Sequence, residues 1–184
     1  MFDQFYTTLE SLGIVPVVVL DKVEDAAPLA HALMAAGMKS AEVTFRTACA
    51  AECIAAMAEA EPEMCVGAGT VLTVEQVEQA RAAGAKFIVS PGYNEALVAH
   101  CQEKGVLVLP GCVNASDMTR AANAGLEYVK FFPAEQSGGV NGVMINKDAW
   151  NQLPEEYQNA IQMAAEICTS EQLSRYLWMD FDST

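Results

Sequence analysis

The chain has 184 residues, of which 52% are hydrophobic and 18% charged, and its formal net charge is −14. This length suits one sizeable core, and so high an apolar fraction excludes an intrinsically disordered chain. With 24 acidic against 10 basic side chains, we expect no nucleic-acid partner, because a duplex requires a positively charged surface.

The apolar segments are short. The longest uninterrupted one runs from Ile14 to Leu20, far below the roughly 20 residues that a membrane span requires. The first residues, MFDQFYTTLE, lack the basic region that opens a signal peptide. We therefore expect a cytoplasmic protein with no membrane partner.

The chain has six cysteines but no C-x-x-C pair, and its two histidines, His31 and His100, are far apart. Most of the cysteines stand in apolar or Ala-rich stretches. We expect buried, reduced thiols rather than a disulfide framework, and no bound metal.

Six short runs rich in Val, Ile and Phe recur along the chain, about 20 to 26 residues apart. They are near-continuously apolar, which is typical of parallel strands covered on both faces. The predicted strands are 15–20, 41–45, 65–69, 86–90, 106–110 and 127–132. Ala-rich stretches between them predict helices, among them 24–37, 74–84, 95–105 and 116–125.

Glycines and capping residues mark the same period. Thr73 and Ser116 precede acidic first turns and are predicted helix N-caps. Four glycines stand where a helix would end in a left-handed residue, namely Gly37, Gly84, Gly105 and Gly125. Six successive βα units follow, and the local pattern leaves both an open doubly wound sheet and a (β/α)8 barrel possible.

The pattern changes after Gly142. Residues 142–184 predict mainly helix, with Pro154 near a helix start and apolar residues at helical spacing beyond it. We therefore divide the chain into a βα segment, 1–141, and a helical C-terminal tail, 142–184.

Lys130 lies in a strongly apolar strand, Tyr128-Val129-Lys130-Phe131-Phe132. Such surroundings desolvate an amine and favour its neutral form, which can attack a carbonyl. A lysine that extends from the strand end into solvent is the alternative, and the local sequence does not decide between them.

A second polar group interrupts the strand at 41–45. With a two-residue period, Glu42, Thr44 and Arg46 share one face. Arg46 could hold a substrate carboxylate and Glu42 could transfer protons. A structural pair between Glu42 and Arg46 at the strand end is the alternative.

The turn Gly67-Ala68-Gly69-Thr70 follows another strand. It lacks the third glycine of a dinucleotide-binding motif and the Gly-Lys-Ser/Thr of a P-loop. It could bring backbone N–H groups and the Thr70 hydroxyl to a small anion, or be a plain tight turn. Pro91-Gly92 and Pro110-Gly111 are predicted to close two further strands. All these groups fall at the carboxyl ends of strands, where barrels and open α/β sheets place their sites.

The segments VPVVVL, EVTFRT, VGAGTVLT, FIVSPG, LPGC and VKFFPAEQSGG together resemble the 2-dehydro-3-deoxy-phosphogluconate (KDPG)/4-hydroxy-2-oxoglutarate aldolases. The resemblance covers about residues 1–141. It implies a (β/α)8 barrel, usually trimeric, that cleaves 2-dehydro-3-deoxy-6-phosphogluconate to pyruvate and glyceraldehyde 3-phosphate by class I chemistry. That chemistry uses a covalent Schiff base and neither metal nor external cofactor.

The resemblance also implies roles for individual residues. Lys130 would form the Schiff base and Glu42 would be the general acid and base. The pyruvyl carboxylate would be held by Arg46, Thr70 and the backbone of Gly67 and Gly69, and the pocket would be walled by Pro91 and Phe132.

The resemblance stops near Val140, where two more βα units with phosphate-binding turns are expected and not found. Residues 143–184 instead resemble the C-terminal end of solute-binding proteins of tripartite ATP-independent periplasmic transporters. We therefore predict an incomplete barrel of about six βα units with open strand edges, and oligomerisation. A chimeric, non-catalytic protein is the main alternative to an aldolase, and an organic-acid-binding fragment is a minor one.

Overall fold

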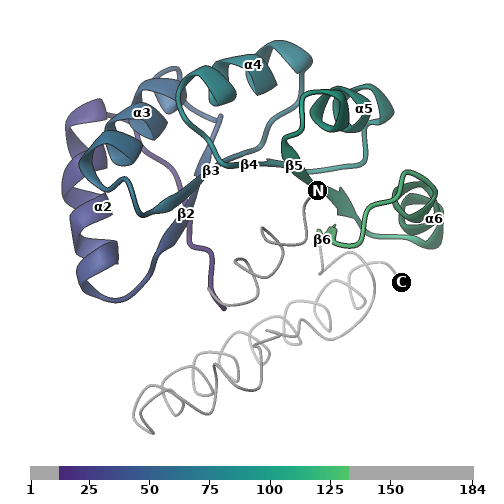
Figure 1. Cartoon of the computed structure of the whole chain (residues 1–184), viewed down its shortest axis with the longest axis horizontal. Helices are drawn as coiled ribbons and strands as arrows, with labels where there is room; N and C mark the ends of the chain where they lie inside the picture. The colour runs from purple at the N-terminus through teal and green to yellow at the C-terminus, as the bar shows by residue number, and fades with distance from the viewer. Residues whose placement is uncertain (1–12, 133–184) are drawn as a thin grey trace, which may run out of the picture. The chain divides into compact units, whose positions relative to one another are not determined.

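The computed structural model describes residues 13–132. Within them, six parallel strands form one curved sheet in chain order, each strand pairing with the next (Figure 1). The strands are β1 (Val17–Val18), β2 (Ser40–Thr44), β3 (Cys65–Gly69), β4 (Phe87–Ser90), β5 (Leu107–Cys112) and β6 (Lys130–Phe131).

The helices lie along the outer, convex side of this sheet, as Figure 1 shows. A short 3₁₀ helix, η1 (Val23–Asp25), leads into the first of them. The α-helices are α2 (Ala26–Ala35), α3 (Ala50–Ala60), α4 (Val74–Ala82), α5 (Glu95–Glu103) and α6 (Ala115–Asn123). Sequential strand order with helices outside is the arrangement of a (β/α)8 barrel, whereas a doubly wound sheet reverses its strand order. The described residues are thus an incomplete, six-stranded barrel.

The helix ends largely match the predicted punctuation. Gly37, Gly84, Gly105 and Gly125 all have positive φ, between 65° and 93°. Thr73 caps α4 in a reciprocal capping box with Gln76. The predicted cap of α6 was wrong by two residues: Asn114, not Ser116, is the N-cap, because its side-chain oxygen accepts from the Asp117 N–H.

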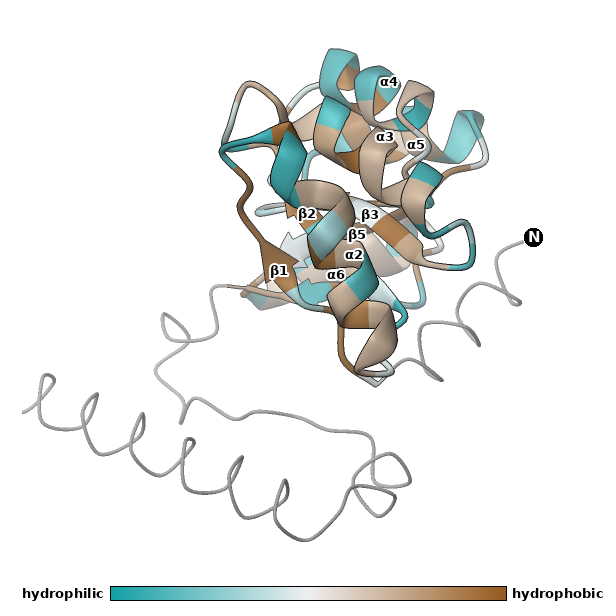
Figure 2. Cartoon of the chain, turned by 90° about the vertical axis from the view of Figure 1, so that its left-hand side faces the viewer, coloured by the Kyte–Doolittle hydropathy of each residue, from teal (hydrophilic) through white to brown (hydrophobic). Residues whose placement is uncertain are grey.

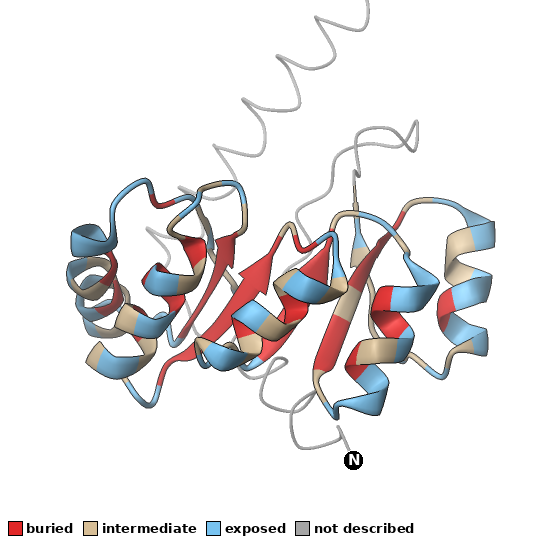
Figure 3. Cartoon of the chain, turned by 90° about the horizontal axis from the view of Figure 1, so that it is seen from above, coloured by how far each residue is buried: buried red, intermediate tan, exposed pale blue. Residues whose placement is uncertain are grey.

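A large apolar core fills the space between sheet and helices. Val43, Val66, Ile88 and Val108 of the strands belong to the same buried cluster as Ile54, Met57, Val77 and Leu97 of the helices. The middle strands, β2 to β5, are almost continuously buried in Figure 3, while the helices are exposed on their outer sides. In Figure 2 hydrophilic residues lie mostly on the helices and loops, and β1 is hydrophobic throughout. This two-sided burial explains why the strand sequences do not alternate.

Alternate strand residues point to the concave inner face. Phe87, Val89, Leu107 and Cys65 form a second, smaller buried cluster there. Strand register places Glu42 beside Gly67, Thr44 beside Gly69, and Gly111 beside Lys130. Register partners in a parallel sheet face the same side, so the inner face carries both the predicted polar residues and several glycines.

The limits of β1, β5 and β6 differ most from prediction. β5 continues through Pro110 and Gly111 instead of closing there, because Ser90 pairs with Pro110 and Lys130 pairs with Gly111. β1 and β6 contain two residues each, shorter than the predicted segments 15–20 and 127–132. Among the described residues each of these two strands pairs with one neighbour, so hydrogen bonds to a second strand do not extend it.

The remaining expectations concern cysteines, membranes and the tail. All five described cysteines are free thiols, four of them buried. Among residues 13–132, no helix combines the length and apolar character needed to cross a bilayer. The predicted helical tail, 142–184, lies outside the described residues.

Candidate active site

Glu42 of β2 and Lys130 of β6 meet on the inner face of the half-barrel. Lys130 Nζ lies 3.3 Å from Oε1 of Glu42 and 3.4 Å from Oε2, although 88 residues separate the two in the chain. The Glu42 side chain is 6% exposed and that of Lys130 is 29% exposed. Because a buried carboxylate is costly without a partner, the lysine side chain is directed inward to Glu42 rather than extended into solvent.

Phe132 lies next to this pair. Its ring centroid is 5.1 Å from Lys130 Nζ, within the range of a cation–π contact. Pro91 follows the end of β4, and its carbonyl oxygen packs tightly against Gly111 of β5. Gly111 is the register partner of Lys130. Both predicted wall residues therefore stand close to the lysine strand.

Arg46 lies beyond the end of β2, since the strand stops at Thr44. The period-two argument therefore does not reach it, and it does not pair with Glu42 as one alternative supposed. Its Nε donates a hydrogen bond of 3.3 Å to Thr70 Oγ1. The Arg46 side chain is otherwise exposed at the carboxyl ends of the strands, with its outer guanidinium nitrogens available for a carboxylate.

Thr70 is the one described non-glycine residue with positive φ, at 54°. This conformation is strained for a β-branched residue. Backbone hydrogen bonds on both sides impose it: the Phe45 N–H donates to Gly69 O at 2.7 Å, and the Val71 N–H donates to Val89 O at 3.1 Å. These hydrogen bonds fix the strained backbone, and the Thr70 hydroxyl therefore stays at the strand ends, where Arg46 donates to it.

Gly67 and Gly69 face the same interior. A Cβ atom on Gly67 would collide with the ring of Phe87, and one on Gly69 would collide with the carboxylate of Glu42. Both glycines lie within β3, so they contribute space as well as the backbone groups singled out by the sequence. Gly111, which the sequence analysis gave no site role, leaves similar space beside Pro91.

The buried thiols are poorly suited to nucleophilic chemistry. Burial raises the pKa of Cys53 to about 12, with the neighbouring Cys49 as a further cause. Burial likewise raises the pKa of Cys101 to about 11. Both side chains stay protonated near neutral pH, so neither thiol is a strong nucleophile.

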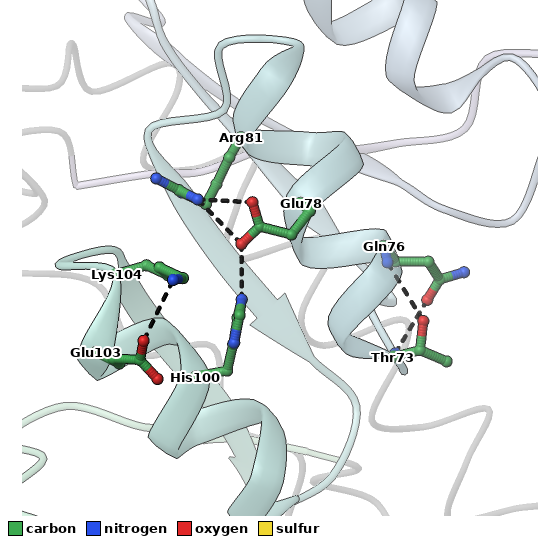
Figure 4. Close-up of polar contacts among 7 residues, drawn as sticks. All are labelled: Thr73, Gln76, Glu78, Arg81, His100, Glu103 and Lys104. Atoms are coloured by element: carbon green, nitrogen blue, oxygen red, sulfur yellow. Dashed lines mark hydrogen bonds and ion pairs between the residues drawn. The ribbon is translucent and has the colours of Figure 1, made fainter.

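One polar cluster was missed by the sequence analysis. On the outer surface, Glu78 of α4 accepts hydrogen bonds from Arg81, at 2.7 and 3.0 Å, and from His100 of α5, at 2.6 Å (Figure 4). The three-residue spacing of Glu78 and Arg81 was a visible signal, but the link to His100 depends on helix packing. The cluster joins two outer helices away from the inner face.

An inner-face lysine paired with a carboxylate, at the carboxyl ends of barrel strands, is the arrangement expected of a lysine-dependent aldolase. The comparisons with known proteins give the particular family. The model of the KDPG and KHG aldolase family matches residues 6–153. The chain belongs to this family, and the match extends past the boundary predicted at residue 141.

Individual relatives agree with this assignment. The chain is 53% identical to a 2-dehydro-3-deoxy-phosphogluconate aldolase of Treponema pallidum over 134 residues, 73% of this chain and 64% of the relative. It matches the crystal structure of the 2-keto-3-deoxy-6-phosphogluconate aldolase of Zymomonas mobilis ZM4 with 3-phosphoglycerate at a TM-score of 0.70 and 42% identity. That match covers 76% of this chain and 66% of the other.

A third similar protein is the KDPG aldolase of Legionella pneumophila, whose structure holds pyruvate captured as a covalent carbinolamine intermediate. The match has a TM-score of 0.67 and 38% identity, and covers 70% of this chain and 62% of that one. The chain thus spans slightly less than two thirds of the length of these three proteins. The likeness of residues 143–184 to transporter solute-binding proteins finds no counterpart among them and falls outside the described residues.

Proposed function

We propose that the chain is a Schiff-base aldolase that cleaves 2-dehydro-3-deoxy-6-phosphogluconate to pyruvate and glyceraldehyde 3-phosphate, with 4-hydroxy-2-oxoglutarate as a candidate second substrate. The observation that carries the proposal is the Lys130–Glu42 pair on the inner face. A lysine amine beside a proton-transferring carboxylate supplies both groups that carbon–carbon cleavage of a 2-keto acid requires. The reaction would need no metal and no external cofactor.

In the first stage, the neutral Lys130 amine attacks the keto carbon of the substrate to form a carbinolamine. Glu42 donates a proton to the hydroxyl, which leaves as water and gives a protonated imine. A base then removes the proton of the C4 hydroxyl and the C3–C4 bond breaks. The bond's electron pair moves into the imine to form an enamine, and the aldehyde departs.

In the second stage, the enamine takes a proton at its terminal carbon, and we assign this transfer to Glu42, 3.3 Å from Lys130 Nζ. Water then hydrolyses the imine, which releases pyruvate and restores the amine. No electrons are gained or lost overall. One carbon–carbon bond breaks and one carbonyl forms, which is the balance of a lyase.

The other site residues would bind and orient the substrate. Arg46, held by Thr70, would pair with the carboxylate next to the keto group, together with the Gly67–Gly69 backbone. Pro91 and Phe132 would limit the pocket and exclude water. A cytoplasmic location and a trimeric assembly complete the proposal and rest on the sequence and on the family likeness.

The test is steady-state cleavage of the phosphorylated substrate, followed through pyruvate release. We expect turnover by the natural chain and none by Lys130→Met, because methionine has no amine to form the imine. Lys39→Met, on an exposed position, serves as the control and should retain full activity. Folded natural chain without turnover would favour a non-catalytic, chimeric protein instead.

A further inference from the structure

Gly69 lacks a side chain for a reason other than backbone conformation. The described glycines with positive φ are Gly13, Gly37, Gly84, Gly105 and Gly125. Gly69 is absent from this group and lies inside the regular strand β3. An alanine could adopt the same backbone without strain, so the requirement must come from the space in front of it.

That space is occupied by the carboxylate that binds Lys130. A Cβ atom on Gly69 would lie 2.6 Å from Cγ and from Cδ of Glu42 and would overlap Oε1. Oε1 is also the oxygen 3.3 Å from Lys130 Nζ. Glu42, whose register partner on β3 is Gly67, thus folds toward the strand ends and passes over Gly69, which has no side chain.

The group that would have to move differs between the two inner-face glycines of β3. At Gly69 it is the end of a Glu side chain, which can rotate. At Gly67 it is the ring of Phe87, which is packed in the inner apolar cluster. A methyl group at Gly69 should therefore displace the carboxylate with little harm to the fold, whereas one at Gly67 should disturb packing.

We propose that Gly69 is a positioning residue: its missing side chain is what allows the Glu42 carboxylate to reach Lys130. This inference deepens the proposed function and rests on it for its catalytic consequence. Its geometric part, the dependence of the Lys130–Glu42 contact on Gly69, can be tested without any turnover.

The test measures how fast acetic anhydride acylates Lys130, by peptide mass analysis, relative to the exposed Lys39 of the same chain. In the natural chain the Lys130 amine is held against both carboxylate oxygens of Glu42, which limits its encounter with the reagent. We expect Gly69→Ala to raise the relative rate severalfold, as Glu42→Gln should, because each change releases the amine from the carboxylate. The Gly69→Ala/Glu42→Gln double variant should show no further increase, because both changes remove the same contact.

Gly67→Ala is the matched control. It adds the same methyl group two residues earlier on the same face, and should lower stability while leaving the relative rate at Lys130 unchanged. An unchanged rate in Gly69→Ala, or rates that add in the double variant, would overturn the proposal. If Gly69→Ala does not fold, Gly69→Ala/Glu42→Ala should, because truncating the Glu42 side chain vacates the space; failure of that variant also overturns it.

Trapping of pyruvate by borohydride, run on the same variants, separates a failure of the proposed aldolase function from a failure of the proposed role of Gly69. A natural chain that traps no pyruvate, but shows the non-additive acylation pattern, would refute the proposed function and leave the role of Gly69 intact. Trapping by the natural chain together with additive acylation rates would support the proposed function and overturn the role of Gly69.

Discussion

Glu42 and Lys130 illustrate how a buried charge pair depends on tertiary structure. Neither residue has a charged partner within its own strand, and each would be costly in an apolar strand if left alone. The curvature of β3, β4 and β5 brings them to within 3.3 Å. The cost of burying Glu42 is thereby offset by the amine that the proposed reaction uses.

Thr70 gives a prediction at the same scale. Thr70→Gly removes the strain of φ 54°, worth about 1–2 kcal/mol, but adds freedom to the unfolded chain, worth about 0.4–1 kcal/mol. We expect the free energy of unfolding in urea to stay equal or to rise by up to about 1.6 kcal/mol. The concentration of pyruvate that half-saturates trapping should rise, because Arg46 loses its hydroxyl partner.

Thr70→Val is the control for that experiment. It keeps the β-branched shape and the strain but removes the hydroxyl, so it should weaken pyruvate trapping without the gain in stability. A Thr70→Gly chain less stable than the natural one by more than about 1 kcal/mol would show that the conformation is not strained.

The candidate residues could be identified from the sequence because polar residues in apolar strands are exceptions with few explanations. Their contacts could not. Glu42 and Lys130 are 88 residues apart in the chain, so their contact cannot be predicted from local sequence. Because β2 ends at Thr44, Arg46 does not lie on the shared face that strand alternation predicts. The steric role of Gly69 depends on the conformation of another side chain and leaves no local signal.

At the scale of secondary structure, the outer helices are tied by polar contacts as well as by apolar packing. Glu78 joins α4 to α5 through His100, and Arg81 completes the cluster. The hydrogen bonds from His100, followed by those from Arg81, hold the pKa of Glu78 below its usual value of 4.5. The folded state therefore favours the ionised form of this carboxyl more than the unfolded state does.

This cluster predicts a pH-dependent stability difference. Because the pKa of Glu78 is lower in the folded state, its contribution is present above about pH 4.5 and is lost as the pH falls through the folded value. Urea unfolding should find Glu78→Gln less stable than the natural chain near neutral pH, with the difference shrinking below pH 4.5. An exposed pair, Glu103–Lys104, supplies the control: Glu103→Gln should have little effect at any pH. A difference for Glu78→Gln that grows in acid would contradict the assignment.

The helices and strands were largely predictable, because apolar runs indicate buried strands and glycines in the left-handed conformation end helices. The errors arose where a neighbour decides the limit. Pairing with Lys130 extends β5 through Gly111. The Asn114 side chain accepts a hydrogen bond from the Asp117 N–H, so α6 starts earlier in the chain than predicted. The choice between a barrel and an open sheet likewise depends on strand order, which local periodicity does not contain.

At the scale of the whole molecule, the described sheet ends at β1 and β6. Val17 is 53% exposed and Phe131 is 41% exposed. Edge strands with apolar exposed side chains favour association between chains. We predict that the protein forms oligomers, and light scattering coupled to size-exclusion chromatography should give a mass that is a multiple of 19.7 kDa.

A charged residue on the edge strand provides a check on that mechanism. Val17→Lys should shift the mass distribution toward smaller species, because an inserted charge opposes edge pairing. Ala35→Lys, an exposed change on the outer helix α2, should leave the mass as it is. A monodisperse monomer of the natural chain, with a closed eight-stranded barrel, would contradict the prediction.

The central claim is that Lys130 forms a covalent imine with a 2-keto acid. Its most direct test is to incubate the purified chain with pyruvate, reduce with borohydride and locate the product by peptide mass analysis. The account predicts one pyruvyl group on the peptide that contains Lys130, and none in Lys130→Met. A folded chain with no adduct, or an adduct on another lysine, would contradict it.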